Sequence, residues 1–146
     1  PDGSMKERIT YSEPGEGAWR FPDWHKNVMV CIRYLKDVNY SEIFLMDSIG
    51  NNTQRITFNE AEDSYPKLSG NKIAYTFKSP DNILFQICTI NTDGTGFKQL
   101  TRGYTCDWSP DGKQIVYTDS RAENGRLWIM DTDGSNKKQL TFKYQF

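Results

Sequence analysis

The side chains that could carry chemistry in this sequence are few, and each lacks the partners that its chemistry needs. His25 is the only histidine, so it is the only ordinary candidate for a general base at neutral pH. No G-x-S-x-G sequence supplies an activated serine for it. We therefore interpret His25 as a surface turn residue and predict that the chain is not an enzyme.

One acidic turn has the beginning of a metal site. Asp131-Thr132-Asp133-Gly134 starts like a calcium loop, but such a loop needs further oxygen ligands and a closing glutamate. Lys137 and Lys138 occupy that region instead. A similar sequence occurs at Asn91-Thr92-Asp93-Gly94, as expected if both segments are the same recurring hairpin turn. We expect no metal and no cofactor.

The cysteines do not indicate a disulfide framework or a zinc site. There are three cysteines, an odd number, and no two of them form a CxxC pair: Cys31, Cys88 and Cys106. Each falls in an expected strand, where a buried thiol behaves as a small hydrophobic side chain.

Composition and charge limit the kinds of partner and the cell compartments that need to be considered. The 146 residues carry a net charge of −1, which gives no field to attract nucleic acid. No apolar run approaches the ~20 residues of a membrane-spanning helix, so we expect a soluble chain without membrane insertion. We expect no secretory leader at the N-terminus of this sequence, unless one has been removed. The compartment stays open: cytoplasmic, or periplasmic or secreted if a leader has been removed.

The elements that would position any site are short strands. Lys113–Thr118 and Arg126–Asp131 have the β-branched and aromatic residues that suit a half-buried sheet. Ser109-Pro110-Asp111-Gly112 and Asp133-Gly134 provide the turns between them. Thr105–Trp108 stands at the head of this unit, and Gln139–Phe142 is its fourth and last strand.

This unit repeats along the chain. The closing strand Gln139-Leu140-Thr141-Phe142 has counterparts at Gln99-Leu100-Thr101, Arg55-Ile56-Thr57-Phe58 and Arg8-Ile9-Thr10-Tyr11. A period of roughly 40–45 residues with four strands per unit is typical of β-propeller blades. The sequence therefore predicts an all-β protein with three blades of four antiparallel strands, at about residues 11–58, 59–101 and 102–142. Residues 1–10 would form a turn and a closing strand.

The third unit resembles the TolB-like β-propeller repeat. Trp108-Ser109-Pro110-Asp111-Gly112, the Asp-x-Asp-Gly turn and Gln139–Thr141 match that repeat. The first two units depart from it, with the shorter turns Trp24-His25-Lys26-Asn27 and Leu68-Ser69-Gly70-Asn71. Ser79-Pro80-Asp81-Asn82 follows a second strand and is interpreted as an unrelated turn. The resemblance implies a complete propeller of six or more blades.

Three blades would leave two apolar faces open. Either the chain is a fragment of a longer propeller, or two copies close into a six-bladed homodimer; we favour the homodimer. The segment Arg8–Tyr11 would be a spare strand of a lost blade or a strand that closes a neighbour's edge. Pro1–Ser4 are either a native hairpin turn or a cloning scar.

In a propeller the inner strands line the channel and the loops that lead into them surround its mouth. Tryptophan, tyrosine and arginine are frequent at binding hot spots. The predicted contact residues at this mouth are Trp19, Arg20, Glu62, Asp63 and Tyr104. By contrast, Trp24, Leu68 and Trp108 share one repeat position and are predicted to pack between blades, and Phe44 and Trp128 are predicted core residues.

Three functions remain open at this point. The first is a non-catalytic module that binds an unidentified protein or peptide through the channel-mouth loops, the role that the TolB-like resemblance implies. The second is a fragment of the gating propeller of a serine peptidase, whose catalytic residues lie on another domain. The third is a carbohydrate-binding propeller whose aromatic rings stack on sugars.

Overall fold

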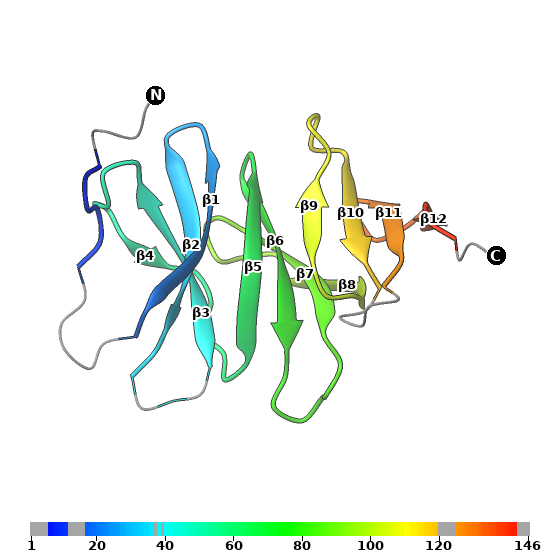
Figure 1. The fold of residues 1–146 in the computed structure, drawn as a ribbon, viewed down its shortest axis with the longest axis horizontal. Coiled ribbons are helices and arrows are strands. Elements are labelled where there is room, and N and C mark those ends of the chain that lie inside the picture. Colours follow the sequence, from blue (N-terminus) through cyan, green and yellow to red (C-terminus); the bar gives the residue numbers. More distant parts are fainter. Residues whose placement is uncertain (1–5, 12–16, 37, 39, 120–124, 143–146) are drawn as a thin grey trace.

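Every regular element of the structure is a β-strand. The computed structural model describes residues 6–11, 17–36, 38, 40–119 and 125–142, and in these it has twelve strands and no helix (Figure 1). The strands are β1 (Trp19–His25), β2 (Val28–Tyr34), β3 (Ser41–Asp47), β4 (Gln54–Arg55), β5 (Glu62–Ser69), β6 (Lys72–Lys78), β7 (Gln86–Asn91), β8 (Lys98–Arg102), β9 (Cys106–Trp108), β10 (Gln114–Thr118), β11 (Leu127–Asp131) and β12 (Lys138–Gln139).

The strands form three successive antiparallel groups of four, which we call blade 1 (β1–β4), blade 2 (β5–β8) and blade 3 (β9–β12). Within each blade, consecutive strands pair with their neighbours. Blades 1 and 2 are joined by a single parallel bridge between Ser41 and Glu62. In Figure 1 the blades follow one another across the view, and β1, β5 and β9 are the first strands of each.

Local sequence explains the turns. In the turn before β10, the amide of Gly112 donates to the carbonyl of Ser109 at 2.8 Å, and Gly112 has a φ of 69°. The left-handed region is open to glycine because it has no Cβ. The amide of Asn82 donates to the carbonyl of Ser79 in the β6–β7 turn, so this Ser-Pro-Asp sequence does follow a second strand.

The core lies between the blades. One buried cluster joins blades 1 and 2, and a second joins blades 2 and 3. The first contains Val30, Ile32, Ile43, Leu45, Ile56, Leu68, Ile73, Tyr75, Cys88 and Ile90. The second contains Ala74, Ile87, Leu100, Cys106, Ile115, Tyr117 and Met130. The predicted core residue Phe44 is buried and Trp128 packs half-buried against the second cluster.

Two expectations from the sequence are not met within this single chain. Residues 8–11 form no strand, and among the described residues no backbone hydrogen bond joins them to one. Trp24 is 58% exposed, whereas Leu68 and Trp108 pack between blades as expected. The reason is positional: Trp24 lies on the side of blade 1 where this chain has no preceding blade. Pro1–Ser4 lie outside the described residues.

No helix long and apolar enough to cross a membrane occurs in the described residues.

Candidate functional site

A row of aromatic side chains crosses the three blades: Phe21 and Tyr65 lie within the first strands β1 and β5, Tyr104 precedes β9, and Phe85 precedes the third strand β7. The rings of Phe21 and Tyr65 lie 4.3 Å apart, those of Tyr65 and Tyr104 5.3 Å, and those of Tyr104 and Phe85 5.1 Å. The hydroxyls of Tyr65 and Tyr104 are hydrogen-bonded at 2.8 Å. All four rings are half-buried. We call Phe21, Tyr65, Tyr104 and Phe85 the aromatic row.

Irregular backbone positions two of these rings. Phe21 and Tyr65 have φ values of 52° and 50°, and each lies where the pairing of its strand with the next one shifts register. A bulge of this kind redirects a side chain at the edge of a sheet. Positive φ is rare for aromatic residues, so blades 1 and 2 maintain the same strained conformation at one equivalent position.

A charged hollow adjoins the row. It has a volume of about 380 Å³ and is lined by Tyr40, Glu60, Glu62, Lys78, Ser79 and Pro80. Lys78 connects the two features, since its Nζ lies 3.7 Å from Glu62 Oε2 and 5.3 Å from the centre of the Phe85 ring. The β2–β3 and β6–β7 loops contribute to this end of the molecule, at the bottom of Figure 1.

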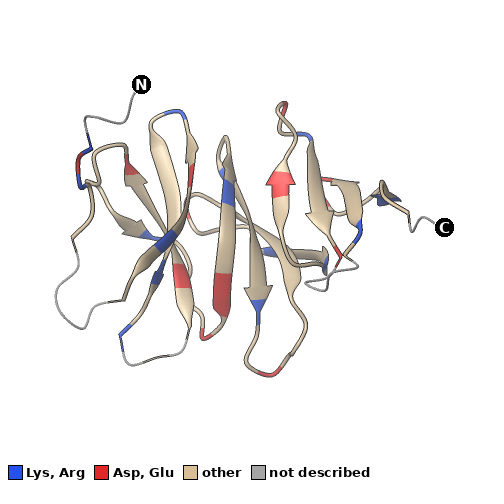
Figure 2. Ribbon diagram, viewed as in Figure 1, with Lys and Arg blue, Asp and Glu red and all other residues tan. Residues whose placement is uncertain are grey.

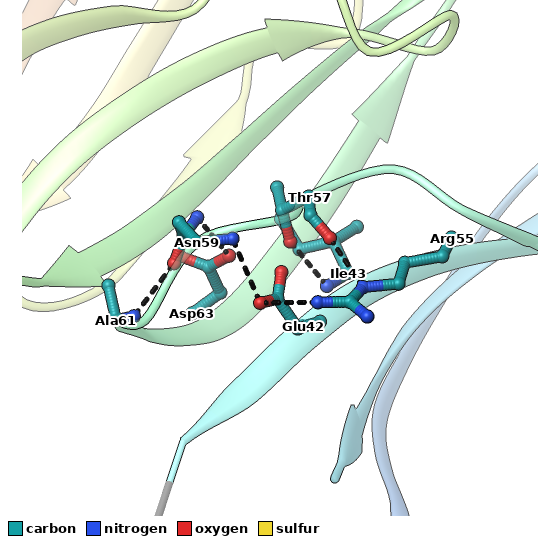
Figure 3. Close-up of polar contacts among 7 residues, drawn as sticks. All are labelled: Glu42, Ile43, Arg55, Thr57, Asn59, Ala61 and Asp63. Atoms are coloured by element: carbon teal, nitrogen blue, oxygen red, sulfur yellow. Dashed lines mark hydrogen bonds and ion pairs between the residues drawn. The ribbon is translucent and has the colours of Figure 1, made fainter.

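A buried polar network connects blade 1 with the segment that leads into blade 2 (Figure 3). Glu42 accepts hydrogen bonds from Arg55 Nη2 at 2.9 Å and from the amide of Asn59 at 3.0 Å. Asn59 Nδ2 donates to Asp63 Oδ2 at 3.1 Å. The amide of Ile43 donates to Thr57 Oγ1 at 2.9 Å. The network fixes the β4–β5 connection, and thereby the position of Glu60 and Glu62.

Two carboxylates share this network with a single cation. Glu42 and Asp63 are fully buried, and Glu42 Oε2 and Asp63 Oδ1 have no hydrogen-bond partner. The pKa of Asp63 is raised to about 7, chiefly by burial and also by the nearby Glu42, while hydrogen bonds from Thr57 and Asn59 act in the opposite direction. Asp63 is therefore a buried structural acid in this structure.

The five predicted contact residues do not all lie together. Glu62 lines the hollow, Tyr104 belongs to the aromatic row, and Arg20 is exposed beside Phe21. Asp63 is buried. Trp19 packs edge-on against Phe44 at 5.2 Å, under the guanidinium of Arg33, on the outer side of blade 1.

Sequence reasoning missed Tyr40, Lys78 and the rings of Phe85, Phe21 and Tyr65. The first three come from the β2–β3 and β6–β7 loops or strand ends, and the last two lie within first strands, whereas the prediction considered only the loops that lead into first strands. Lys78 closes β6 just before the Ser79-Pro80 turn. The Ser79-Pro80 turn could have indicated these residues, because the loop between the second and third strands of a blade lies at the same end as the loop that leads into its first strand.

The other candidate residues have local roles. His25 ends β1, at the opposite end of that strand from Trp19 and Arg20. Asp133 Oδ1 accepts hydrogen bonds from the amide and hydroxyl of Ser135, which lower the pKa of Asp133. No group of three or more His, Cys, Asp or Glu side chains suited to a metal ion occurs in the described part of the chain.

All three cysteine thiols are buried and free. Burial raises the pKa of Cys31 and of Cys106 to about 12, which disfavours the reactive thiolate.

Solved structures share this fold over most of the chain. Putative TolB from Agrobacterium tumefaciens matches with a TM-score of 0.66 and 24% identity, over 80% of this chain and 43% of that one. TolB from Acinetobacter baumannii matches with a TM-score of 0.69 and 21% identity, over 87% and 33% of the two chains. This chain has a TolB-like β-propeller fold.

The propeller domain of the Trilobed protease from Pyrococcus furiosus, described as having an open velcro topology, matches with a TM-score of 0.67 and 14% identity. That match covers 90% of this chain and 45% of the other. The chain thus spans less than half the length of each of these three structures, and it is a partial propeller. No protein-family model and no curated protein matches it.

Proposed function

We propose that the chain is a non-catalytic recognition module that binds a segment of another protein across the aromatic row and the adjoining hollow. The observation that supports this is the continuous run of four half-buried rings beside the Lys78–Glu62 ion pair. Partly exposed tyrosine and phenylalanine rings offer a large contact area at a low cost in side-chain entropy. Arg20, Lys78 and Glu60 would select the charges of the bound segment.

The test starts from a displayed library of random peptides, selected on the immobilised chain. A selected peptide is labelled and titrated by fluorescence anisotropy. Tyr104→Ala is expected to weaken its binding at least about tenfold, the effect of losing one ring at a hot spot. Ile49→Ala, which truncates an exposed apolar side chain in the β3–β4 turn, is the matched control and is expected to bind normally.

Circular dichroism would establish that each variant is folded. Unchanged binding of every selected peptide by both Tyr104→Ala and Lys78→Ala would contradict the proposal. Turnover of peptide or glycoside substrates by the chain alone would contradict its non-catalytic part. Carbohydrate is a second candidate ligand, favoured by the same row of rings, and a glycan array would identify it.

We further propose that two copies assemble head to tail into one six-bladed ring. The two end faces of the chain support this proposal. On blade 1, Met29, Cys31, Phe44 and Met46 face the side without a preceding blade, where they are buried beneath Ile9, Trp19 and Leu35. They occupy the register positions of Ile73, Tyr75, Cys88 and Ile90, which in blade 2 pack against the preceding blade.

Blade 3 offers the complementary face. Val116, Leu127, Ile129 and Leu140 occupy the positions that Val30, Ile43, Leu45 and Ile56 hold in blade 1. The residues of blade 1 are buried against blade 2, whereas Leu127 and Leu140 are 41% and 45% exposed. Each end face has the residue pattern of an interblade surface. A second copy of this chain would therefore cover both, with its blade 3 against blade 1 and its blade 1 against blade 3.

Trp24 marks the same junction. The equivalent Trp108 packs on blade 2, and its Nε1 donates to the carbonyl of Lys67 at 2.8 Å. Exposure of a tryptophan at an interblade position is expected when the neighbouring blade belongs to another copy. In the proposed ring, Trp24 packs on blade 3 of the second copy.

A further inference from the structure

Residues 8–11 have the local structure of an outermost blade strand. Arg8 Nε donates to the carbonyl of Thr10 at 2.8 Å, and Arg55 Nε donates to the carbonyl of Thr57 at the same distance. The guanidinium of Arg8 lies 4.8 Å from the Tyr11 ring, as that of Arg55 lies 4.5 Å from the Phe58 ring. The two segments thus share side-chain geometry as well as sequence.

The segment also has the packing of an outermost strand. A Cβ placed on Gly50 would meet the carbonyl oxygen of Ile9 at 1.9 Å, and one placed on Gly94 would meet that of Ile56 at 3.3 Å. A Cβ on Gly134 would likewise contact Leu100. In blades 2 and 3 this contact comes from the outermost segment of the preceding blade, so Ile9 occupies that position against blade 1.

Outermost segments bind the third strand of their own blade through one repeated pair of hydrogen bonds. In blade 1 the amide of Ile56 donates to the carbonyl of Ile43 at 2.8 Å, and the amide of Ile43 donates to Thr57 Oγ1 at 2.9 Å. In blade 3 the amide of Leu140 donates to the carbonyl of Leu127 at 2.8 Å, and the amide of Leu127 donates to Thr141 Oγ1 at 2.9 Å.

Residues 8–11 lack that third strand. Among the described residues, no backbone hydrogen bond joins them to a strand. In this segment the amide of Ile9 corresponds to that of Ile56, and the hydroxyl of Thr10 corresponds to that of Thr57. In the proposed ring, the third-strand residue available to both groups is Leu127 of the second copy. The single amide proton of Leu127 serves only one threonine, so Thr10 and Thr141 compete for it.

We propose that residues 8–11 of one copy replace residues 139–142 of the other as the outermost strand of blade 3, an inference that rests on the proposed ring. Ile9 already packs on Gly50 at the junction, while Leu140 and Phe142 are 45% and 71% exposed. The closing strand of each half ring is therefore exchanged between copies. An exchanged strand adds a backbone connection to an interface otherwise made of apolar side chains.

The test compares two threonine variants in the full chain. Thr10→Val keeps the shape of the side chain and removes the acceptor for the Leu127 amide; Thr141→Val is its matched counterpart. The dimer dissociation constant is measured by sedimentation velocity. Thr10→Val is expected to raise it about tenfold and Thr141→Val to leave it unchanged, while Thr10→Ser retains the wild-type value.

The reverse pattern, with Thr141→Val weakening the dimer and Thr10→Val neutral, would overturn the exchange and leave the ring in place. A stable dimer whose dissociation constant is unchanged in both Thr10→Val and Thr141→Val would also overturn the exchange. A wild-type chain that stays monomeric at every concentration would overturn the ring, and with it this inference. Thermal unfolding of the dilute variants would separate a loss of folding from a loss of association.

Discussion

The residue with the most consequential environment is Asp63. Its carboxyl group is buried next to Glu42, and Arg55 is the cation of that network. A buried acid of raised pKa favours the folded state when it is protonated, because folding removes the charged form from water. The contribution is thus fully present below about pH 4, where both states are protonated, and is lost as the pH rises through about 7.

Asp63→Asn is expected to stabilise the chain at pH 8 by about 2 kcal/mol, because the amide is neutral and its oxygen still accepts from Asn59. The gain should shrink as the pH falls and vanish near pH 4. Urea unfolding at several pH values would measure it. Asp81→Asn, in the exposed β6–β7 loop, is the control. A gain that does not depend on pH would contradict the assignment of a buried ionising carboxyl group.

Arg55→Met is expected to destabilise the chain by about 3 kcal/mol, because Glu42 is fully buried and would lose its cation. The double variant Glu42→Gln with Arg55→Met should recover part of this loss, since no buried charge is then left unpaired. Chemical unfolding of Arg55→Met, of Glu42→Gln and of the double variant tests both expectations. A double variant as unstable as the sum of the single variants would show that the charges are not coupled.

At the scale of the elements, strands and turns were largely predictable from the sequence. Gln114–Thr118 alternates and carries β-branched residues, and it forms β10 as expected, with Ile115 and Tyr117 in the core toward blade 2. Two outermost strands were predicted too long, since β4 and β12 have two residues each, whereas β8 (Lys98–Arg102) contains the whole of the expected Gln99–Thr101. Pattern alone does not reveal whether a pairing partner is present, so the closing strand expected at residues 8–11 stays a prediction.

The contact site was less predictable than the strands. Glu62 and Tyr104 could be proposed from residue type and from their place before a first strand. The burial of Asp63 could not, because it depends on the Asn59 and Glu42 contacts made across two blades. The positive φ of Phe21 and Tyr65 had a signal that the prediction did not use, because each residue is followed by a proline at the same position of the repeat, Pro22 and Pro66.

Gly50→Ala tests the packing of the N-terminal segment against blade 1. Gly50 and Gly70 both have positive φ, but only Gly50 lies against another segment, the carbonyl of Ile9. Alanine at either site costs about 1 kcal/mol in backbone strain. Gly50→Ala is expected to cost at least about 1 kcal/mol more, and thermal unfolding compares the two. Equal losses would mean that residues 8–11 contribute no stability.

At the scale of the whole molecule, the three blades form an arc with an apolar face at each end. Interblade clusters bury ten residues at one junction and seven at the next. The corresponding surfaces at the two ends have the same register: Ile9, Trp19 and Leu35 pack on that of blade 1, whereas Leu127 and Leu140 leave that of blade 3 partly exposed. Figure 2 shows Lys, Arg, Asp and Glu of both signs distributed over the strands and loops, without a segregated charged face. Apolar closure, rather than charge, is the expected driving force for association.

The measurement that tests this account most directly is the solution mass of the chain, by light scattering behind a sizing column over a wide range of concentrations. The account predicts a stable species of twice the 16.9 kDa chain mass. Trp24→Ala, which removes an exposed interblade side chain, should shift that species to the monomer without lowering the melting temperature of the dilute chain. A wild-type monomer at every concentration, folded and free of aggregates, would contradict the closed ring.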